Sequence, residues 1–144
     1  METFSEILNE LMKENSVEAK PLAVYLGLSD PSVIYKWLKN EKSLLLPTAV
    51  KIADFFHCSL DYLFGRSGEY GKDSYCECPP FDVQFRKVLS EQKVTQYKLL
   101  KDKVISGGNI DSWFNKKRIP HIDSIIKLAQ YLNVSMDYLV GRED

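Results

Sequence analysis

The sequence predicts an all-α protein made of two copies of one small five-helix domain. Two runs carry the repeat, and they lie 76 residues apart: Ser59-Leu-Asp-Tyr-Leu-Phe-Gly-Arg66 and Ser135-Met-Asp-Tyr-Leu-Val-Gly-Arg142. The same offset relates Trp37 to Trp113. Apolar residues recur with the period of helices, whereas alternating β-branched runs and Asn-Gly turns are absent. A repeat of this length indicates two domains in tandem.

Apolar stripes predict the first two helices of each domain. The first stripe consists of Phe4, Ile7, Leu8, Leu11 and Met12, and its counterpart consists of Phe81, Phe85, Val88 and Leu89. Short segments with one apolar side, at 21–26 and 96–103, predict the second helices. Pro21 belongs in the first turn of its helix because it has no amide hydrogen. Gly27 suits the left-handed stop that follows.

The third helix of each domain begins at a recognisable cap. Asp30 followed by Pro31 favours a helix start there, and the helix then runs to about residue 39. Ser106 caps the matching helix of the second domain. Trp37 and Trp113 recur at the helical spacing of apolar core residues, so we expect them to be buried.

The last two helices follow in the same order in both domains. A fourth helix starts near Pro47 or Ile122 and carries an apolar face. Ser59 and Ser135 then cap a short fifth helix. The aspartate two residues after each serine suits the positive end of that helix.

The repeat predicts domains at 1–66 and 81–144, joined by a linker at 67–80 that lacks periodicity. Fully extended, such a linker could span about 46–50 Å. Residues 1–68 carry 7 Lys and Arg against 9 Asp and Glu, a balance of −2, whereas residues 80–144 carry 11 against 8, a balance of +3. Only the second domain has the positive balance expected of a protein that approaches polyphosphate.

Several functional classes are not indicated. His57 and His121 lack a neighbouring nucleophile or carboxylate, so we predict neither an enzyme nor a cofactor. Cys76 and Cys78 lie one residue apart, but a metal site needs about four suitably spaced ligands, so exposed thiols are expected. Cys58 is expected to be buried. No apolar run approaches the ~20 residues of a membrane span, and the acidic start is unlike a secretory signal. We therefore expect a cytoplasmic protein that binds no membrane.

The motifs of a known family occur in order in both domains. In the second domain they are Val94-Thr-Gln-Tyr-Lys-Leu-Leu, Ile105-Ser, Ile110-Asp-Ser-Trp113 and Val134-Ser-Met-Asp-Tyr-Leu-Val-Gly-Arg142. In the first they include Gly27-Leu-Ser29, Lys51-Ile-Ala53 and Ser59-Leu-Asp-Tyr-Leu-Phe-Gly65. The chain resembles the Cro/repressor-type regulators, the xenobiotic-response-element class of bacterial helix-turn-helix proteins. The resemblance implies two lambda-repressor-like domains in a transcriptional repressor that binds specific sequences of double-stranded DNA.

The resemblance places the third helix of each domain in the major groove, with its first turns at the base edges. In the second domain it points to Gly107, Gly108, Asn109, Asp111 and Ser112, and in the first to Ser32, Val33, Tyr35 and Lys36. Thr95 and Gln96 match the family's phosphate-holding pair. Lys116, Lys117 and Arg118 follow the third helix, and there they neutralise phosphates or complement the negative helix end.

The doubling leaves two hypotheses for the first domain. In one, both domains bind DNA and the chain reads a bipartite, non-palindromic site by itself. In the other, the first domain is a protein-interaction or self-association module, through which the chain forms a homodimer or binds a protein partner. Only the second domain then binds DNA. The acidity of the first domain, its Asp30 and its apolar Leu44-Leu45-Leu46 run favour this second hypothesis.

Overall fold

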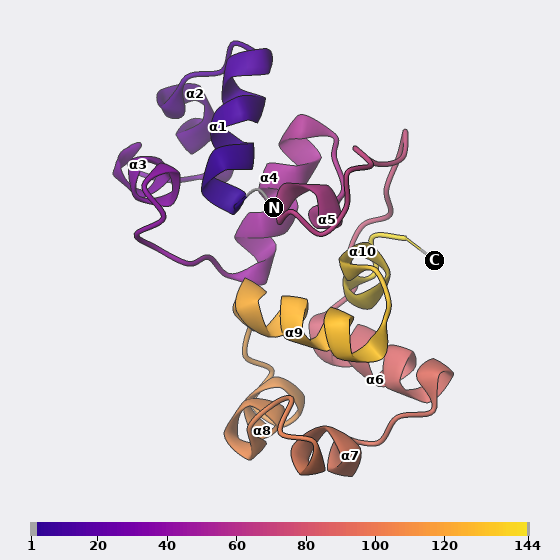
Figure 1. Ribbon diagram of the computed structural model, residues 1–144. Helices are drawn as coiled ribbons and strands as arrows, with labels where there is room; N and C mark the ends of the chain where they lie inside the picture. Colours follow the sequence, from indigo (N-terminus) through magenta and orange to yellow (C-terminus); the bar gives the residue numbers. More distant parts are fainter. Residues whose placement is uncertain (1–2, 144) are drawn as a thin grey trace. The chain divides into compact units, whose positions relative to one another are not determined.

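The computed structural model of the protein describes residues 3–143, and within this range it contains ten helices and no strands (Figure 1). The predicted all-α fold is confirmed. The chain divides into two compact units, unit 1 (Met1–Ser74) and unit 2 (Tyr75–Asp144). The segment expected as a linker, residues 67–80, contributes its first part to unit 1 and its second part to unit 2.

Unit 1 is built from five helices around one core. They are α1 (Phe4–Glu14), α2 (Ala19–Leu26), α3 (Ser32–Leu38), α4 (Leu46–Phe56) and α5 (Leu60–Leu63). The buried face of α1 carries Ile7, Leu8 and Leu11, as the apolar stripe predicts. This face lies against α3 and α5, while α4 contacts α2 and α5. On α4, Ala49, Ile52 and Ala53 are fully buried in the same core.

Unit 2 repeats the five-helix arrangement. Its helices are α6 (Phe81–Gln92), α7 (Gln96–Lys101), α8 (Gly107–Phe114), α9 (Ile122–Leu132) and α10 (Met136–Val140). α6 contacts α8 and α10, the counterparts of the contacts that α1 makes with α3 and α5. Its buried side includes Phe85 and Val88, which are fully buried.

The serine caps predicted for α5, α8 and α10 are present, and Thr95 caps α7 in the same way. The side chains of Ser59, Thr95, Ser106 and Ser135 each accept a hydrogen bond from the backbone N–H three residues further on. Gly27 ends α2 in the left-handed conformation, with φ of 76°. These bonds satisfy backbone groups that a helix end leaves without a partner.

Three helix limits differ from the prediction. α2 starts at Ala19, which still leaves Pro21 in the first turn. α3 starts at Ser32, one residue late, although the Asp30 carboxylate accepts from the Ser32 N–H at 2.8 Å as a cap does. α7 ends at Lys101 because Lys103 adopts a left-handed φ of 57°, and the Val104 N–H donates back to the Leu99 carbonyl at 3.0 Å.

A tryptophan fixes the third helix of each unit to the first. Trp37 and Trp113 are 2% and 3% exposed, which confirms their predicted place in the core. Trp37 meets the ring of Phe4 on α1, and Trp113 meets those of Phe81 and Phe85 on α6, edge to face in each case. Such aromatic pairs add to the burial of apolar area and fix ring orientation. The orientation of α3 and α8 is therefore set by the core.

The repeated Asp-Tyr-Leu…Gly-Arg run forms an ion pair that the sequence did not lead us to expect. Arg66 Nη1 lies 2.5 Å from Asp61 Oδ1, and Arg142 Nη1 lies 2.5 Å from Asp137 Oδ1. The Arg142–Asp137 side chains are 0% and 2% exposed, against 21% and 11% for Arg66–Asp61. The signature therefore locks the last helix of each unit to the chain that follows it.

Candidate nucleic-acid interface

The helix-turn-helix of unit 2 consists of α7, the turn at 102–106, and α8 (Figure 1). Ile110, Trp113 and Phe114 face the core from α8. The residues predicted to read bases start on the opposite side, where Gly107, Gly108 and Asn109 are exposed, while Asp111 and Ser112 are half-buried. α8 therefore presents its first turn to the outside while its apolar side is held by the core.

Thr95 and Gln96 open α7, as expected for the phosphate-holding pair. The Thr95 hydroxyl oxygen accepts from the Lys98 N–H at 3.1 Å, so its main local task is to cap the helix. Gln96 is half-buried. Beside it, Tyr97 is 71% exposed, and Lys98 is exposed as well. The sequence analysis did not single out Tyr97 and Lys98. Leu99 is the sole residue that α7 buries within its span, which leaves these two neighbours on the surface.

The Asp111 carboxylate is already engaged by its own helix end. Its Oδ1 accepts from the Asn115 side-chain amide at 2.7 Å, and its Oδ2 lies 3.7 Å from Lys116 Nζ. Asp111 is therefore engaged with the end of α8, while its side chain is still 49% exposed. Asn115, which the sequence analysis left out, belongs to this cluster.

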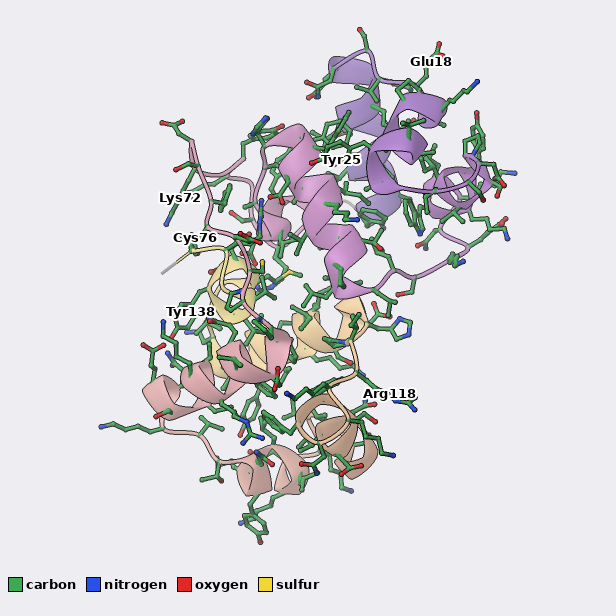
Figure 2. The ribbon with its side chains drawn as sticks, turned by 180° about the vertical axis from the view of Figure 1, so that it is seen from behind. Glu18, Tyr25, Lys72, Cys76, Arg118 and Tyr138 are labelled. Atoms are coloured by element: carbon green, nitrogen blue, oxygen red, sulfur yellow. The ribbon has the colours of Figure 1, made fainter. Side chains whose placement is uncertain are left out.

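The basic run that follows α8 is held near the helix by its backbone. The Arg118 N–H donates to the Ser112 carbonyl at 2.9 Å, and Lys117 adopts a left-handed φ of 51°. Lys116, Lys117 and Arg118 are all exposed. Figure 2 shows the Arg118 side chain pointing outward from unit 2. Unit 2 thus brings its predicted residues together in one helix-turn-helix and the segment that follows it.

The corresponding surface of unit 1 is chemically different. Ser32, Tyr35 and Lys36 are exposed on α3, and Tyr35 is 53% exposed. Hydrogen bonds from Ser32 lower the pKa of the Asp30 carboxyl, so a negative charge stays at the start of this helix. At the 76-residue offset, Asn40, Glu41 and Lys42 stand where unit 2 has its three cations.

The apolar run 44–46 is largely part of the unit 1 core. Leu44 is 5% exposed and Leu46 is 7% exposed, whereas Leu45 is 40% exposed. Two of the three side chains are thus unavailable to a partner. The run is explained by the packing of the segment that enters α4.

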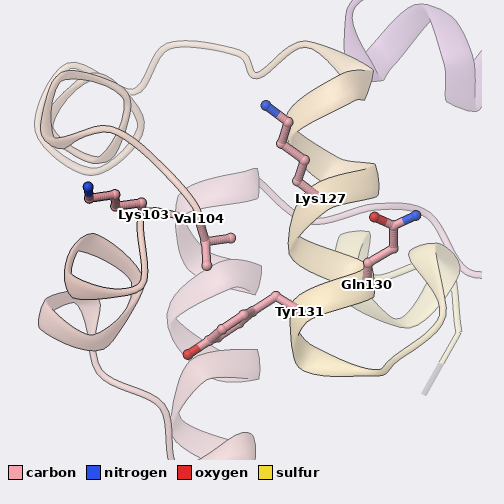
Figure 3. Close-up of a pocket in the computed structure, with 5 residues that line it drawn as sticks. All are labelled: Lys103, Val104, Lys127, Gln130 and Tyr131. Carbon is pink, nitrogen blue, oxygen red and sulfur yellow. The ribbon is translucent and has the colours of Figure 1, made fainter.

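A hollow of about 410 Å³ lies beside the turn of the unit 2 helix-turn-helix, lined by Lys103, Val104, Lys127, Gln130 and Tyr131 (Figure 3). The Tyr131 hydroxyl donates to Asp102 at 2.5 Å, and this bond lowers the pKa of the Asp102 carboxyl. In Figure 3 the Lys103 and Lys127 side chains both point away from Tyr131, and their ends lie apart from each other. The two lysines therefore do not converge on one point. The hollow lacks the convergent polar groups typical of a ligand site.

The part of the chain that the structure describes holds neither a metal-binding cluster nor a membrane-spanning helix. Among residues 3–143, no three or more side chains of His, Cys, Asp or Glu are grouped so that they could hold a metal ion. Within the same residues, no helix is long and apolar enough to span a membrane.

The two glycines of α8 are not required by the fold. A methyl group on Gly107 would meet Leu100 Cδ2 at 3.8 Å, and one on Gly108 would meet Ser106 Oγ at 4.0 Å, both ordinary contacts. Neither glycine has a positive φ. The sequence thus forgoes helix stability here, which makes room for another molecule close to the backbone.

A pair of alanine substitutions tests this reading of the glycines. Gly108→Ala should raise the stability of unit 2 by about 0.5–1 kcal/mol, because alanine is the better helix former. Gly141→Ala should instead cost about 1–3 kcal/mol, because overpacking adds to backbone strain: Gly141 has φ of +90°, and its methyl group would lie 2.5 Å from Pro79 Cδ. Urea unfolding followed by tryptophan fluorescence measures both. A Gly108→Ala variant less stable than the parent would show that α8 needs this glycine.

Comparison with known proteins agrees with this geometry. A sequence model of a helix-turn-helix family matches the chain twice, over residues 8–63 and over residues 84–139. The two matches cover α2 and α3 in unit 1 and α7 and α8 in unit 2. No curated protein and no solved structure is significantly similar to the chain. With most of its length matched, the chain belongs to this helix-turn-helix family of DNA-binding domains and carries two of them in tandem.

Proposed function

We propose that the protein is a transcriptional repressor that recognises specific sequences of double-stranded DNA, and that α8 of unit 2 leads this recognition. The observation that carries the proposal is the exposed first turn of α8, together with three exposed cations at 116–118, just beyond the end of the same helix. A first turn that reaches base edges and a cationic segment that reaches phosphates are the two parts of such an interface. We place the protein in the xenobiotic-response-element class and in the bacterial cytoplasm.

The residues of unit 2 divide the recognition between bases and backbone. Asn109 is the base reader, because its amide can bond to both N6 and N7 of adenine. Gly107 and Gly108 let the start of α8 come close to the DNA without side chains in the way. Gln96 and the N–H groups near it hold a phosphate from the start of α7. Lys117 and Arg118 neutralise phosphates beyond the end of α8.

Unit 1 binds DNA more weakly in this proposal and supplies the second half of a bipartite site. Its Ser32, Tyr35 and Lys36 contact the groove, while Asp30 and Glu41 reduce the attraction to phosphate. Because the two reading helices differ at every one of these positions, the site should not be a palindrome.

The second candidate function assigns unit 1 to protein binding or self-association. Exposed apolar side chains favour it: Val24 is 71% exposed, Tyr25 is 49% exposed and Tyr35 is 53% exposed. Isolated apolar residues on a surface are normal, so this observation weighs less than the match to a DNA-binding family.

Selection from random duplex DNA with the full chain tests the proposal. We expect a bipartite, non-palindromic sequence whose stronger half is protected by unit 2. A repressor should also lower expression of a reporter gene placed under a promoter that overlaps this sequence. Recovery of a single half-site would support the second candidate for unit 1. Failure to enrich any sequence would refute the proposed function.

A further inference from the structure

The segment that leaves unit 1 is fastened to it at Tyr70. The backbone N–H of Ser59, the cap of α5, donates to the Tyr70 carbonyl oxygen at 2.8 Å. The Tyr70 hydroxyl donates to the Phe56 carbonyl at the end of α4. The Tyr70 ring packs edge to face against the Tyr62 ring, with 5.0 Å between the ring centroids. Burial is the main cause that raises the pKa of the Tyr70 hydroxyl. Unit 1 therefore holds the chain well beyond the end of α5.

The segment that enters unit 2 is fastened from Tyr75 onward. The Tyr75 ring lies over the guanidinium of Arg142, 4.0 Å from its carbon to the ring centroid. The Cys76 N–H donates to the Arg142 carbonyl at 2.8 Å, and Pro79 lies directly against Gly141. Tyr75 thus covers the buried Arg142–Asp137 pair of this unit. Unit 2 therefore holds the chain well ahead of α6.

The two attachments leave residues 71–74 as the covalent bridge between the anchored positions. Five Cα-to-Cα steps from Tyr70 to Tyr75 span at most about 17–18 Å. A free segment over 67–80 would span about 46–50 Å. The anchors remove roughly 30 Å of reach, which corresponds to about nine base pairs of duplex at 3.4 Å each.

We propose that Tyr70 and Tyr75 are specificity-determining residues that fix the allowed spacing between the two half-sites on DNA. This inference rests on the proposed function, in which both units bind one bipartite site. A short tether gives the second binding event a high effective concentration only where it can reach, and none where it cannot. Moving one half-site by two base pairs also turns it by about 70° around the duplex. The chain should therefore accept a narrow range of spacings.

The test compares full-length chains with short and long tethers. One variant, Tyr70→Ala with Tyr75→Ala, releases both anchors. A second inserts Gly-Ser-Gly-Ser after Asp73 and lengthens the bridge while both tyrosines remain. The matched control, Tyr70→Phe with Tyr75→Phe, keeps both rings and both backbone bonds. The probes are duplexes carrying the sequence selected with the full chain, with the spacing between half-sites changed in both directions.

We expect the affinity of the parent and of the phenylalanine control to fall at least about ten-fold when the spacing changes by two base pairs. The alanine and insertion variants should lose less than about three-fold over the same change. The same sharp optimum in the parent and the insertion variant would overturn the proposal, and so would a parent with no optimum.

Hydrogen exchange separates a failure of the anchors from a failure of the proposed function. The amides of Ser59 and Cys76 should exchange more slowly in the parent than in the alanine variant. The Ser59 N–H donates to the Tyr70 carbonyl and the Cys76 N–H donates to the Arg142 carbonyl, and both bonds depend on the anchors. Equal exchange would overturn the proposal even if the chain binds a bipartite site. Slow exchange with no DNA sequence enriched would refute the proposed function, and the spacing role with it, while leaving both anchors established.

Discussion

Reversing the charges of two residues that follow α8 in the sequence should lower DNA affinity by about 100-fold, the largest effect expected of any surface change. The variant is Lys117→Glu with Arg118→Glu. Both side chains are exposed, and the backbone bond from Arg118 to Ser112 keeps them beside the reading helix. The loss should be similar for all sequences, because phosphate contacts carry no sequence information. Fluorescence anisotropy with the selected duplex and with an unrelated duplex measures it.

The salt dependence of binding provides a second readout for the same variant. The slope of log affinity against log salt should fall by about 2, one for each lost phosphate contact. Lys13→Glu with Lys87→Glu is the matched control, since it changes the net charge equally on exposed residues outside α7 and α8. If this control loses as much affinity, net charge alone explains the effect and the proposed interface is wrong. Lys116 is left unchanged because it pairs with Asp111.

The substitution Asp137→Asn should lower the free energy of unfolding of unit 2 by about 3–5 kcal/mol, because it leaves Arg142 charged and buried without its counter-ion. The two side chains are 0% and 2% exposed. The matched substitution in unit 1, Asp61→Asn, should cost about 1–2 kcal/mol because water reaches that pair. The repeated motif therefore has unequal weight in the two units.

Each unit has one tryptophan, which allows the two unfolding transitions to be followed separately. Trp37→Phe leaves Trp113 to report on unit 2, and Trp113→Phe leaves Trp37 to report on unit 1. Replacing both partners, with Asp137→Leu and Arg142→Met, should cost less than Asp137→Asn alone, because no isolated charge stays buried. Equal costs for Asp137→Asn and Asp61→Asn would contradict this account.

The helices could be predicted from the sequence because their signals are local. The apolar stripe of α1, the serine caps of α5, α8 and α10, and Gly27 each act within a few residues. The limits that differed depend on backbone geometry. α7 ends early because Lys103 adopts a left-handed conformation, which a lysine in the sequence does not predict.

The interactions that could not be predicted depend on tertiary burial. The sequence predicts Asp137 as a residue that suits a helix start, because nothing local indicates that Arg142 turns back onto it. The sequence analysis predicts Asp111 as a base contact, but it gives no sign that Asn115 and Lys116 engage the same carboxylate. The anchoring roles of Tyr70 and Tyr75 were missed as well, because residues 67–80 lack the periodicity that marks packed segments. In each case the fold of the unit determines which group lies within reach of the side chain.

The asymmetry between the units bears directly on function. Both share the fold, the buried tryptophan that sets the position of the third helix, and the Asp–Arg pair that holds the last helix to the chain after it. They differ in the residues that this helix presents and in the three positions that follow it. The duplication therefore preserves the scaffold while the surface has diverged, which is the basis for assigning the leading role to unit 2.

The most direct test of that assignment is an NMR titration of the full chain with the selected duplex, which observes both units in one sample. We predict that the largest amide shifts occur in α8, at the start of α7 and at residues 116–118, with smaller shifts in α3. Amide shifts confined to unit 1, or spread evenly over surfaces outside the two helix-turn-helix segments, would contradict the account.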